Sequence, residues 1–216
     1  MKQIQWYPGH MAKTKREVKE KIRAIDIVLE LLDARIPFSS QNPVVKEVCG
    51  NKKRVILLNK ADLADKNELD KWVVFFEKQG LRTLQINAVN GNGVDKILPV
   101  LKEELKELKA KEKARGRIER PIRAMILGIP NVGKSTLINK LANKKKLVVQ
   151  DRPGVTRQTQ YIRVGKDFEL LDTPGILWPK FDDEDVAFRL ALTGAIKDDI
   201  LPLDDIVIYG YKFLDK

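Results

Sequence analysis

The segment Gly128-Ile129-Pro130-Asn131-Val132-Gly133-Lys134-Ser135 has the spacing G-x-x-x-x-G-K-S, whose residue types suit the binding of phosphate groups. Its glycines would let the backbone come close to phosphate oxygens, and successive N–H groups at a helix start attract anions. Lys134 could reach the outer phosphates, and the Ser135 hydroxyl could bind Mg²⁺. The alternative is an ordinary glycine turn before a helix, and the neighbouring segments decide between the two.

The segments that flank this pattern are those that a phosphate loop requires. Residues 122–127 are mostly apolar, as in a strand covered on both faces, and residues 136–141 have the periodicity of a helix. The loop is therefore predicted at a turn from strand to helix, which favours a nucleotide site over an ordinary turn.

A second polar segment, Asn59-Lys60-Ala61-Asp62, follows the apolar residues 54–58. Open α/β sheets bind ligands at the carboxyl ends of their strands, so these side chains could face the same site. Asp62 could accept hydrogen bonds from the N1–H and 2-amino groups of guanine, and adenine offers no donors there. Asn59 and Lys60 would brace the pocket, with the Lys60 stem on the base. The segment favours guanine over adenine, and its alternative is a plain polar loop.

A third segment, Asn87-Ala88, follows one helix and one strand later. The helix is predicted over 66–79, with Leu69, Trp72, Val73 and Phe76 buried, and the strand over 83–86. The backbone N–H of Ala88 could reach the O6 atom of guanine.

Two further segments could contact the last phosphate of the nucleotide or its metal. Asp172 follows the apolar residues 168–171 and suits a Mg²⁺ shell, and Gly175 could bring its N–H to the γ-phosphate. Thr156 lies in the polar segment 150–156 and could offer a second hydroxyl to Mg²⁺. Groups of this kind would form a switch that loses its contacts after hydrolysis.

Basic residues exceed acidic ones, 41 against 30, so the formal charge is +11. They are clustered, because residues 1–24 hold seven basic and two acidic side chains and residues 102–123 hold nine and five. Lys144-Lys145-Lys146 form a third cluster. Such clusters favour an RNA partner, although a solvated, charge-rich surface of the kind found in heat-adapted proteins is the alternative.

The remaining composition narrows the class of protein. The single cysteine, Cys49, excludes an intrachain disulfide and a cysteine-rich metal site, and no apolar stretch is long enough to span a bilayer. The first eight residues lack the apolar region of a signal peptide. We therefore expect a cytoplasmic protein without a membrane partner.

The other elements follow from apolar periodicity and turn residues. A first helix is predicted to bury Val18, Ile22 and Ile25, before a strand over 27–35 and a loop marked by Pro37 and Pro43. A helix after Gly91 and Gly93 runs through Leu108 and gives way to a charged linker over about 109–121. Antiparallel strands are expected at 160–164 and 168–171, and a helix near 186–190. Residues 203–209 fit either a helix or a strand.

Taken together, these motifs resemble those of the bacterial ribosome biogenesis GTPase A family, circularly permuted members of the Ras-like P-loop GTPases. The resemblance covers essentially all 216 residues, and its motifs span residues 6–13, 33–37, 59–62, 128–135, 151–156 and 172–180. The permutation is visible in the order of motifs, because Asn59 and Ala88 precede Gly128, whereas a conventional GTPase chain meets its phosphate loop first. The linker over 109–121 would join the original ends.

The resemblance implies an α/β fold, a Ras-like P-loop GTPase sheet with helices on both faces. It divides the chain into a basic N-terminal arm and helix (1–24), the permuted GTPase domain (25–176) and the start of a helical C-terminal domain (177–216) that is cut short. It implies a GTP-hydrolysing factor in late maturation of the large ribosomal subunit, which binds the subunit precursor and its rRNA with GTP and leaves after hydrolysis. The protein would be monomeric off the ribosome.

The resemblance also bears on hydrolysis. Ile176 stands where many relatives carry the glutamine that orients the attacking water, so basal turnover should be slow. The resemblance implies that His10 supplies the missing polar group on the ribosomal subunit, whereas from the residues alone an RNA contact or local packing is the simpler interpretation. Asn131 resembles the asparagine of potassium-activated GTPases, which implies K⁺ as a second ion.

The resulting site hypothesis names one catalytic residue, His10. The predicted nucleotide-binding residues are Asn59, Lys60, Asp62, Asn87, Ala88, Asn131, Val132, Gly133, Lys134, Ser135, Thr136, Thr156 and Gly175. The predicted metal ligands are Ser135, Thr156 and Asp172 for Mg²⁺, and Asn131 for K⁺. Three alternatives stay open: a nucleotide-regulated RNA-binding module with negligible hydrolysis, a GTPase of tRNA modification or transport and, disfavoured by Asp62, an ATP-dependent enzyme.

Overall fold

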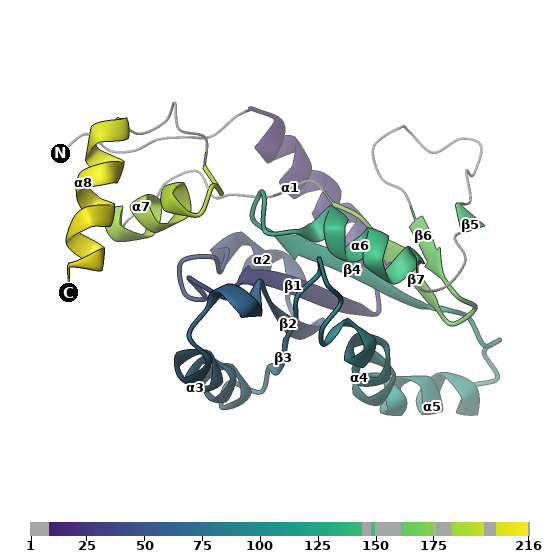
Figure 1. The fold of residues 1–216 in the computed structure, drawn as a ribbon. Coiled ribbons are helices and arrows are strands. Elements are labelled where there is room, and N and C mark those ends of the chain that lie inside the picture. The colour runs from purple at the N-terminus through teal and green to yellow at the C-terminus, as the bar shows by residue number, and fades with distance from the viewer. Residues whose placement is uncertain are drawn as a thin grey trace.

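A computed structural model describes residues 9–143, 148–149, 161–173, 175, 183–196 and 202–215. Within these residues seven strands form one sheet, in the order β3-β2-β1-β4-β7-β6-β5 (Figure 1). Five of them pair in parallel: β1 (Ile27–Asp33), β2 (Lys53–Asn59), β3 (Arg82–Gln85), β4 (Ile122–Gly128) and β7 (Phe168–Leu171). The last two, β5 (Val148–Val149) and β6 (Tyr161–Val164), run antiparallel at one edge.

The central strands are apolar because helices cover both faces of the sheet, and every residue of β1 is buried. On one face, Leu29 and Ile126 pack in a cluster with Leu101 of α4 (Ile97–Glu104) and Leu137 of α6 (Lys134–Asn143). On the other face lie α1 (Gly9–Lys21), α2 (Pro43–Cys49) and α3 (Lys66–Glu77). The predicted α/β fold class is confirmed.

Three helices complete the described chain. Helix α5 (Lys106–Ala114) follows α4 directly, and α7 (Glu184–Leu192) and α8 (Leu203–Leu214) lie together beyond one end of the sheet (Figure 1). None of the helices in the described part of the chain is long and apolar enough to cross a bilayer.

The strand order explains how a permuted chain forms this sheet. β1 lies between β2 and β4, so the chain first extends the sheet toward β3 and later toward β7. The connections that follow β1 and β4 therefore diverge at the carboxyl ends of these two neighbouring strands, and open α/β sheets bind ligands at such a place. The motifs at residues 59–62, 128–135 and 172–175 all lie at the carboxyl ends of strands in this sheet.

Several local expectations need correction. The loop expected after Pro37 contains helix α2, because Asn42 caps its start by accepting a hydrogen bond from Val44 N at 2.9 Å and Pro43 occupies its first turn. The predicted linker over 109–121 is helical as far as Ala114, where α5 ends. Residues 203–209 belong to helix α8, so the strand alternative there is wrong. The short strand β5 was not predicted.

The other elements follow the prediction. Val18, Ile22 and Ile25 are buried together on the face that α1 covers. In α3, Leu69 and Phe76 are buried, and Trp72 and Val73 pack against them. β6 and β7 form the expected antiparallel hairpin.

Candidate nucleotide-binding site

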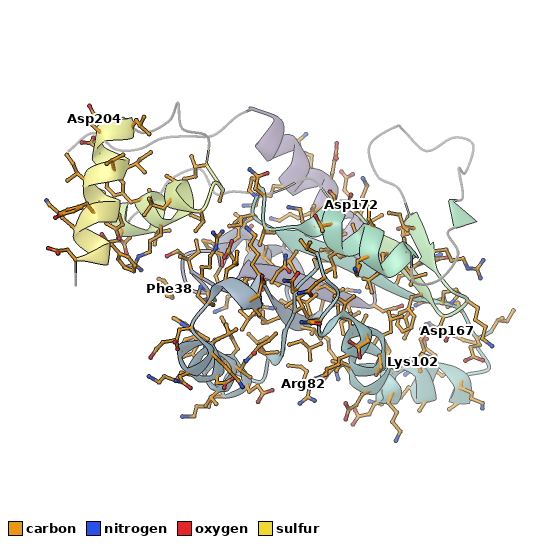
Figure 2. The ribbon with its side chains drawn as sticks, in the orientation of Figure 1. Phe38, Arg82, Lys102, Asp167, Asp172 and Asp204 are labelled. Carbon is orange, nitrogen blue, oxygen red and sulfur yellow. The ribbon has the colours of Figure 1, made fainter. Side chains whose placement is uncertain are left out.

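The site lies where four parallel strands end. Asp33 and Asn59 are the last residues of β1 and β2, Gly128 is the last residue of β4, and Asp172 follows β7. These segments are neighbours in the sheet, so their polar ends meet along one edge. Figure 2 shows Asp172 at this edge, near the start of α6.

The glycines of the phosphate loop are required by close contacts. A Cβ atom on Gly128 would lie 2.6 Å from the carbonyl oxygen of Leu31. Gly133 has a φ of 102°, and a Cβ there would lie 2.4 Å from the side-chain nitrogen of Asn59. The loop then enters α6 at Lys134, with Ser135 and Thr136 exposed in its first turn and Val132 buried.

Lys134 is a buried cation within this loop. Its Nζ donates hydrogen bonds to the carbonyl oxygens of Gly128, at 3.2 Å, and Ile129, at 2.8 Å. Burial lowers the pKa of Lys134 to about 8, and the Asp172 carboxylate partly opposes this shift. Burial likewise raises the pKa of Asp172, while Lys134 lowers it. The two side chains therefore share one partly dehydrated space that could take phosphate oxygens.

The segment after β7 is attached to the phosphate loop. Thr173 Oγ1 donates to the carbonyl oxygen of Ile126 at 2.6 Å, which fixes the residue after Asp172 against β4. Gly175 lies so close to the loop that a Cβ would approach Pro130 Cα to 2.8 Å. Its backbone is thus next to the loop, as the predicted contact of its N–H with the last phosphate would need.

The donor set suits Mg²⁺. Ser135 supplies a hydroxyl and Asp172 a carboxylate, and Mg²⁺ in phosphoryl-transfer sites typically takes one or two protein oxygens together with phosphate oxygens and water. Thr156, the third predicted ligand, lies outside the described residues.

Asn59 joins the two segments that are predicted to recognise the base, residues 59–62 and 87–88, to the phosphate loop. Its Nδ2 donates to the carbonyl oxygen of Val132 at 2.8 Å, and its Oδ1 accepts from Ala88 N at 2.9 Å. The Ala88 N–H that was predicted to reach guanine O6 thus has an intramolecular partner in this structure. Asn87 orders the next turn, since its Oδ1 accepts from Val89 N at 2.8 Å and Asn90 N at 3.0 Å. Asp62 is exposed in the 3-10 turn Ala61–Leu63.

Asp33 and Arg35 are parts of the site to which the sequence analysis assigned no role. Asp33 accepts from Lys60 Nζ at 2.8 Å and from Arg35 Nη2 at 2.7 Å, and Lys60 Nζ also donates to the Asn131 carbonyl oxygen at 3.2 Å. Burial opposes ionisation of Asp33, but the bonds from Arg35 and Lys60 outweigh it and hold its pKa below the ordinary value. The sequence contained a signal for these two residues, because charged residues that end a buried strand lie where open α/β sheets bind ligands.

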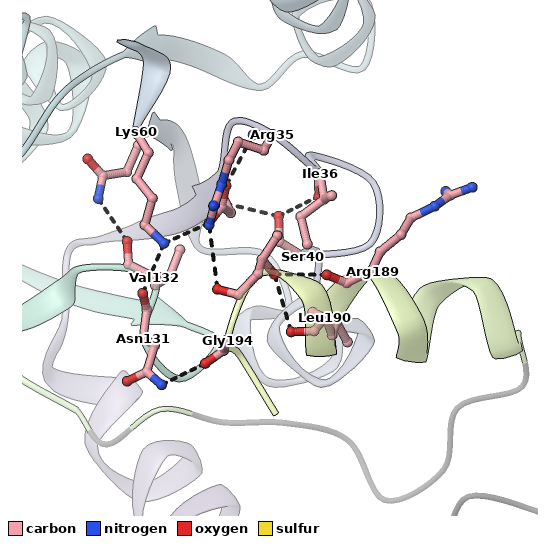
Figure 3. Close-up of polar contacts among 12 residues, drawn as sticks. Arg35, Ile36, Ser40, Lys60, Asn131, Val132, Arg189, Leu190 and Gly194 are labelled. Carbon is pink, nitrogen blue, oxygen red and sulfur yellow. Dashed lines mark hydrogen bonds and ion pairs between the residues drawn. The ribbon is translucent and has the colours of Figure 1, made fainter. Parts of the chain in front are cut away.

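The phosphate loop also contacts the C-terminal helices (Figure 3). Asn131 has a φ of 55°, and its Nδ2 donates to the Gly194 carbonyl oxygen at 2.7 Å. Arg35 Nη2 reaches the carbonyl oxygen of Thr193 at 3.5 Å. Both acceptors lie in the turn after α7, so this turn is bonded to two loops of the site.

Two residues that bear on hydrolysis cannot be placed. His10 belongs to α1, but its side chain is not among those described, and Ile176 lies outside the described residues. The structure therefore places the predicted residues from 59 to 62, 87 to 88, 128 to 136 and 172 to 175, with Pro174 not described, at or just beyond the carboxyl ends of the strands. Their roles in nucleotide and metal binding stay predictions, as do those of His10, Thr156 and Ile176.

Comparisons with known proteins agree with this geometry. Residues 123–205 match the family described as 50S ribosome-binding GTPase. The chain is 60% identical to ribosome biogenesis GTPase A of Bacillus licheniformis over 213 residues, 99% of this chain and 75% of the relative. It is 57% identical to the protein of that name from Bacillus pumilus, over 99% of this chain and 76% of the relative.

Solved structures show the same likeness. The crystal structure of GNP-bound YlqF from T. maritima matches 94% of this chain and 74% of that one, with a TM-score of 0.66 and 32% identity. A GDP-bound structure of YlqF matches 91% of this chain and 74% of that one, with a TM-score of 0.65 and 34% identity. With a phosphate-loop motif at the turn into α6 and relatives of this similarity, the chain belongs to the ribosome biogenesis GTPase A family.

Proposed function

We propose that this chain binds GTP at the carboxyl edge of its sheet, hydrolyses it to GDP and phosphate, and acts as an assembly factor in late maturation of the large ribosomal subunit. The observation that carries the proposal is the pair of hydrogen bonds made by the Asn59 side chain. This one side chain holds Val132 of the phosphate loop and Ala88 of the segment proposed to contact the guanine base. The proposed phosphate-binding and base-binding parts of the site are therefore fixed relative to each other.

The base would be selected by Asp62. Its exposed carboxylate follows β2 next to Lys60, which Asp33 holds by an ion pair at 2.8 Å. A carboxylate in this place accepts hydrogen bonds from guanine N1–H and the 2-amino group and finds no such donors on adenine. Leaving it without partners disfavours ATP, as for other unpaired polar groups in a binding site.

The phosphates would be held by Lys134, the backbone N–H groups of the loop and the start of α6. Mg²⁺, held by Ser135, Asp172 and Thr156, would neutralise charge on the phosphate oxygens when bound. Gly175, packed against Pro130, offers its N–H to the last phosphate. Asn131 is the proposed K⁺ ligand through its side-chain oxygen, while its nitrogen is bonded to Gly194.

Water activation is the incomplete part of this site. Ile176 has no hydrogen-bonding group, which supports slow basal turnover, and His10 is our candidate for the missing group. The direction of α1 supports this choice. The chain passes from the end of α1 through a short 3-10 turn into β1. Helix α1 therefore runs opposite to β1, and its N-terminal end is directed toward the carboxyl ends of the strands, where the nucleotide site is proposed (Figure 1).

The same isoleucine favours a second candidate function. A chain that binds GTP without a residue to orient water could serve as a nucleotide-regulated RNA-binding module with negligible hydrolysis. The two functions differ in turnover on the subunit precursor: the first needs stimulated hydrolysis, and the second needs only GTP-dependent binding and release.

The deciding experiment measures phosphate release from GTP in potassium buffer, with and without isolated large ribosomal subunits. We expect slow turnover of the free protein and faster turnover with subunits, and we expect sodium in place of potassium to lower the rate. His10→Ala should remove the stimulation and leave GTP binding intact, whereas Thr14→Ala, in the same helix, should behave as the wild type. Turnover that subunits never stimulate would favour the RNA-binding module. Equal rates in the two salts would remove the K⁺ role of Asn131.

A further inference from the structure

The edge of the sheet opposite the nucleotide site carries two adjoining hollows with basic walls. One hollow, of about 550 Å³, lies between α4, α5 and the turn of the β6–β7 hairpin; we name it the hairpin hollow. The other, of about 500 Å³, lies where β1, β2 and β4 begin; we name it the strand-start hollow. Arg120, just before β4, lines both, so the two hollows form one continuous surface.

The charge of this surface is strongly positive. Ten of the residues that line the two hollows are lysine or arginine, and four are aspartate or glutamate. The basic residues come from segments far apart in sequence, including Arg23 before β1, Lys52 before β2, Lys106 in α5 and Lys166 before β7. Folding thus gathers at one edge part of two of the basic clusters found in the sequence.

Three of the four carboxylates of this surface are already paired, and several of its cations are not. Asp26 binds Arg120 at 2.7 Å, Asp167 binds Lys102 at 2.7 Å, and Glu112 binds Lys109 at 3.4 Å. Within the described part of the chain, Arg23, Lys106, Arg163 and Lys166 have no ion pair with a carboxylate. Their charge is available to an external anion.

The placement of this surface separates it from the chemistry. It lies at the amino ends of the parallel strands, while the phosphate loop and Asp172 lie at the carboxyl ends (Figure 2, where Lys102 and Asp167 are at one end of the sheet and Asp172 is at the other). A large anion bound here would leave the carboxyl ends of the strands, where the phosphate loop lies, open to GTP.

We propose that the hairpin hollow and the strand-start hollow together bind the sugar-phosphate backbone of a folded RNA. A backbone strand is a convex ridge of regularly spaced negative charges, and two concave basic hollows separated by a fixed arginine match that shape better than they match a flat bilayer. The surface reads shape and charge, since its side chains are lysines and arginines without stacking aromatic residues in the lining. The inference uses the proposed function only for the source of the RNA.

The experiment compares two charge-reversed variants in binding a fluorescently labelled RNA hairpin. The first, Arg23→Glu with Lys106→Glu and Lys166→Glu, places a reversed charge in both hollows. The matched control, Lys66→Glu with Lys71→Glu and Lys78→Glu, makes the same change in net charge at exposed positions in or next to α3. A third variant with glutamine at the first three positions removes charge without adding carboxylates.

We expect the first variant to bind the RNA hairpin at least about tenfold more weakly. The negative slope of log affinity against log salt concentration should become shallower by about three. The glutamine variant should make the slope similarly shallower, and the α3 control should keep wild-type affinity and slope. Equal loss in the control, or wild-type binding by both hollow variants, would overturn the proposal. So would binding of the wild type to vesicles of phosphatidylserine and phosphatidylcholine, or to polyglutamate, as tightly as to RNA.

GTP turnover without RNA, measured on the same variants, keeps the two hypotheses apart. It should be unchanged, because none of the substituted residues lies at the nucleotide edge. If the wild type bound no RNA hairpin but hydrolysed GTP, this inference would fail and the GTPase proposal would stand. If RNA binding depended on the hollows and the wild type had no GTP turnover with subunits, this inference would stand and the GTPase proposal would fail.

Discussion

Lys134 carries its charge in a place where burial disfavours it. Lys134 is only 8% exposed, and its ammonium group donates hydrogen bonds to two carbonyl oxygens of its own loop. The nearby Asp172 attracts this charge, although no direct ion pair joins the two side chains within the described residues. A cation that is only partly compensated gains more from an incoming phosphate than a fully paired one. The lowered pKa is thus a consequence of the same geometry that would bind the nucleotide.

This geometry predicts how GDP binding depends on pH. Burial lowers the pKa of Lys134 to about 8, and phosphates would raise it again because they stabilise the charged form. Affinity for GDP should be constant below that pKa and fall by about tenfold per pH unit above it, as binding comes to require uptake of a proton. Calorimetric titration in two buffers of different ionisation enthalpy measures this uptake. Lys134→Arg, whose charge does not titrate, should give a flat profile, and a flat wild-type profile would contradict the prediction.

At the scale of elements, the turn from β4 to α6 shows how position decides the role of a glycine. Gly133 combines a positive φ of 102° with a contact that leaves no room for a side chain, and the neighbour it meets is Asn59, which connects the phosphate loop to Ala88. Gly80, after α3, has a positive φ of 74° with nothing within 4 Å of a Cβ. The two glycines share a backbone requirement and differ in what surrounds them.

Alanine substitutions separate these two effects. Gly80→Ala should lower the free energy of unfolding by about 1–2 kcal/mol through backbone strain alone. Gly133→Ala should cost a further ~1–3 kcal/mol, because Asn59 must move, and should also weaken GDP binding. Chemical denaturation and GDP titration of both variants check this. Equal losses of stability, or unchanged GDP affinity in Gly133→Ala, would show that the contact with Asn59 has no such role.

At the scale of the whole molecule, the nucleotide edge is joined to the C-terminal helices. The Asp172 segment leads along the chain toward α7, and the turn after α7 is bonded back to Asn131 and Arg35 (Figure 3). A change in the phosphate loop would therefore reach α7 by two connections, one through the backbone and one through side chains. We regard α7 and α8 as the element that nucleotide state would bias.

Hydrogen exchange tests this coupling. Amides of α7 and α8 should differ in protection between GDP and a non-hydrolysable GTP analogue. In Asn131→Ala, loss of the bond to Gly194 should speed exchange in α7 about fivefold, the equivalent of one hydrogen bond of ~1 kcal/mol, and reduce the difference between nucleotides. Asn139→Ala, an exposed asparagine in α6, is the control and should leave α7 unchanged. Identical protection of residues 176–216 with both nucleotides would end this hypothesis.

Much of the fold, and the position of the candidate site residues at the ends of strands, follows from local patterns. The apolar segments before Asn59, Gly128 and Asp172 predicted the strands that position them, because buried parallel strands must be apolar on both faces. Helix α2 is not evident from the sequence because Pro37 and Pro43 are typical of a loop, whereas Pro43 occupies the first turn of a helix capped by Asn42. The charged end of α5 resembles a linker in sequence because none of its residues is buried, so apolar periodicity gives no sign of the helix.

The sequence by itself determined which groups are available for the proposed chemistry, since residue types and spacing decide which groups could hold a phosphate, a guanine or Mg²⁺. The tertiary structure decided which of these groups meet. Three contacts depend on residues far apart in the chain. Asn59 holds Val132 and Ala88 together, and Asn131 is bonded to Gly194. The third is the basic surface lined by Arg23, Lys106 and Lys166. The physical reason is that periodicity and caps are local, whereas these contacts arise from the order and direction of strands in the sheet.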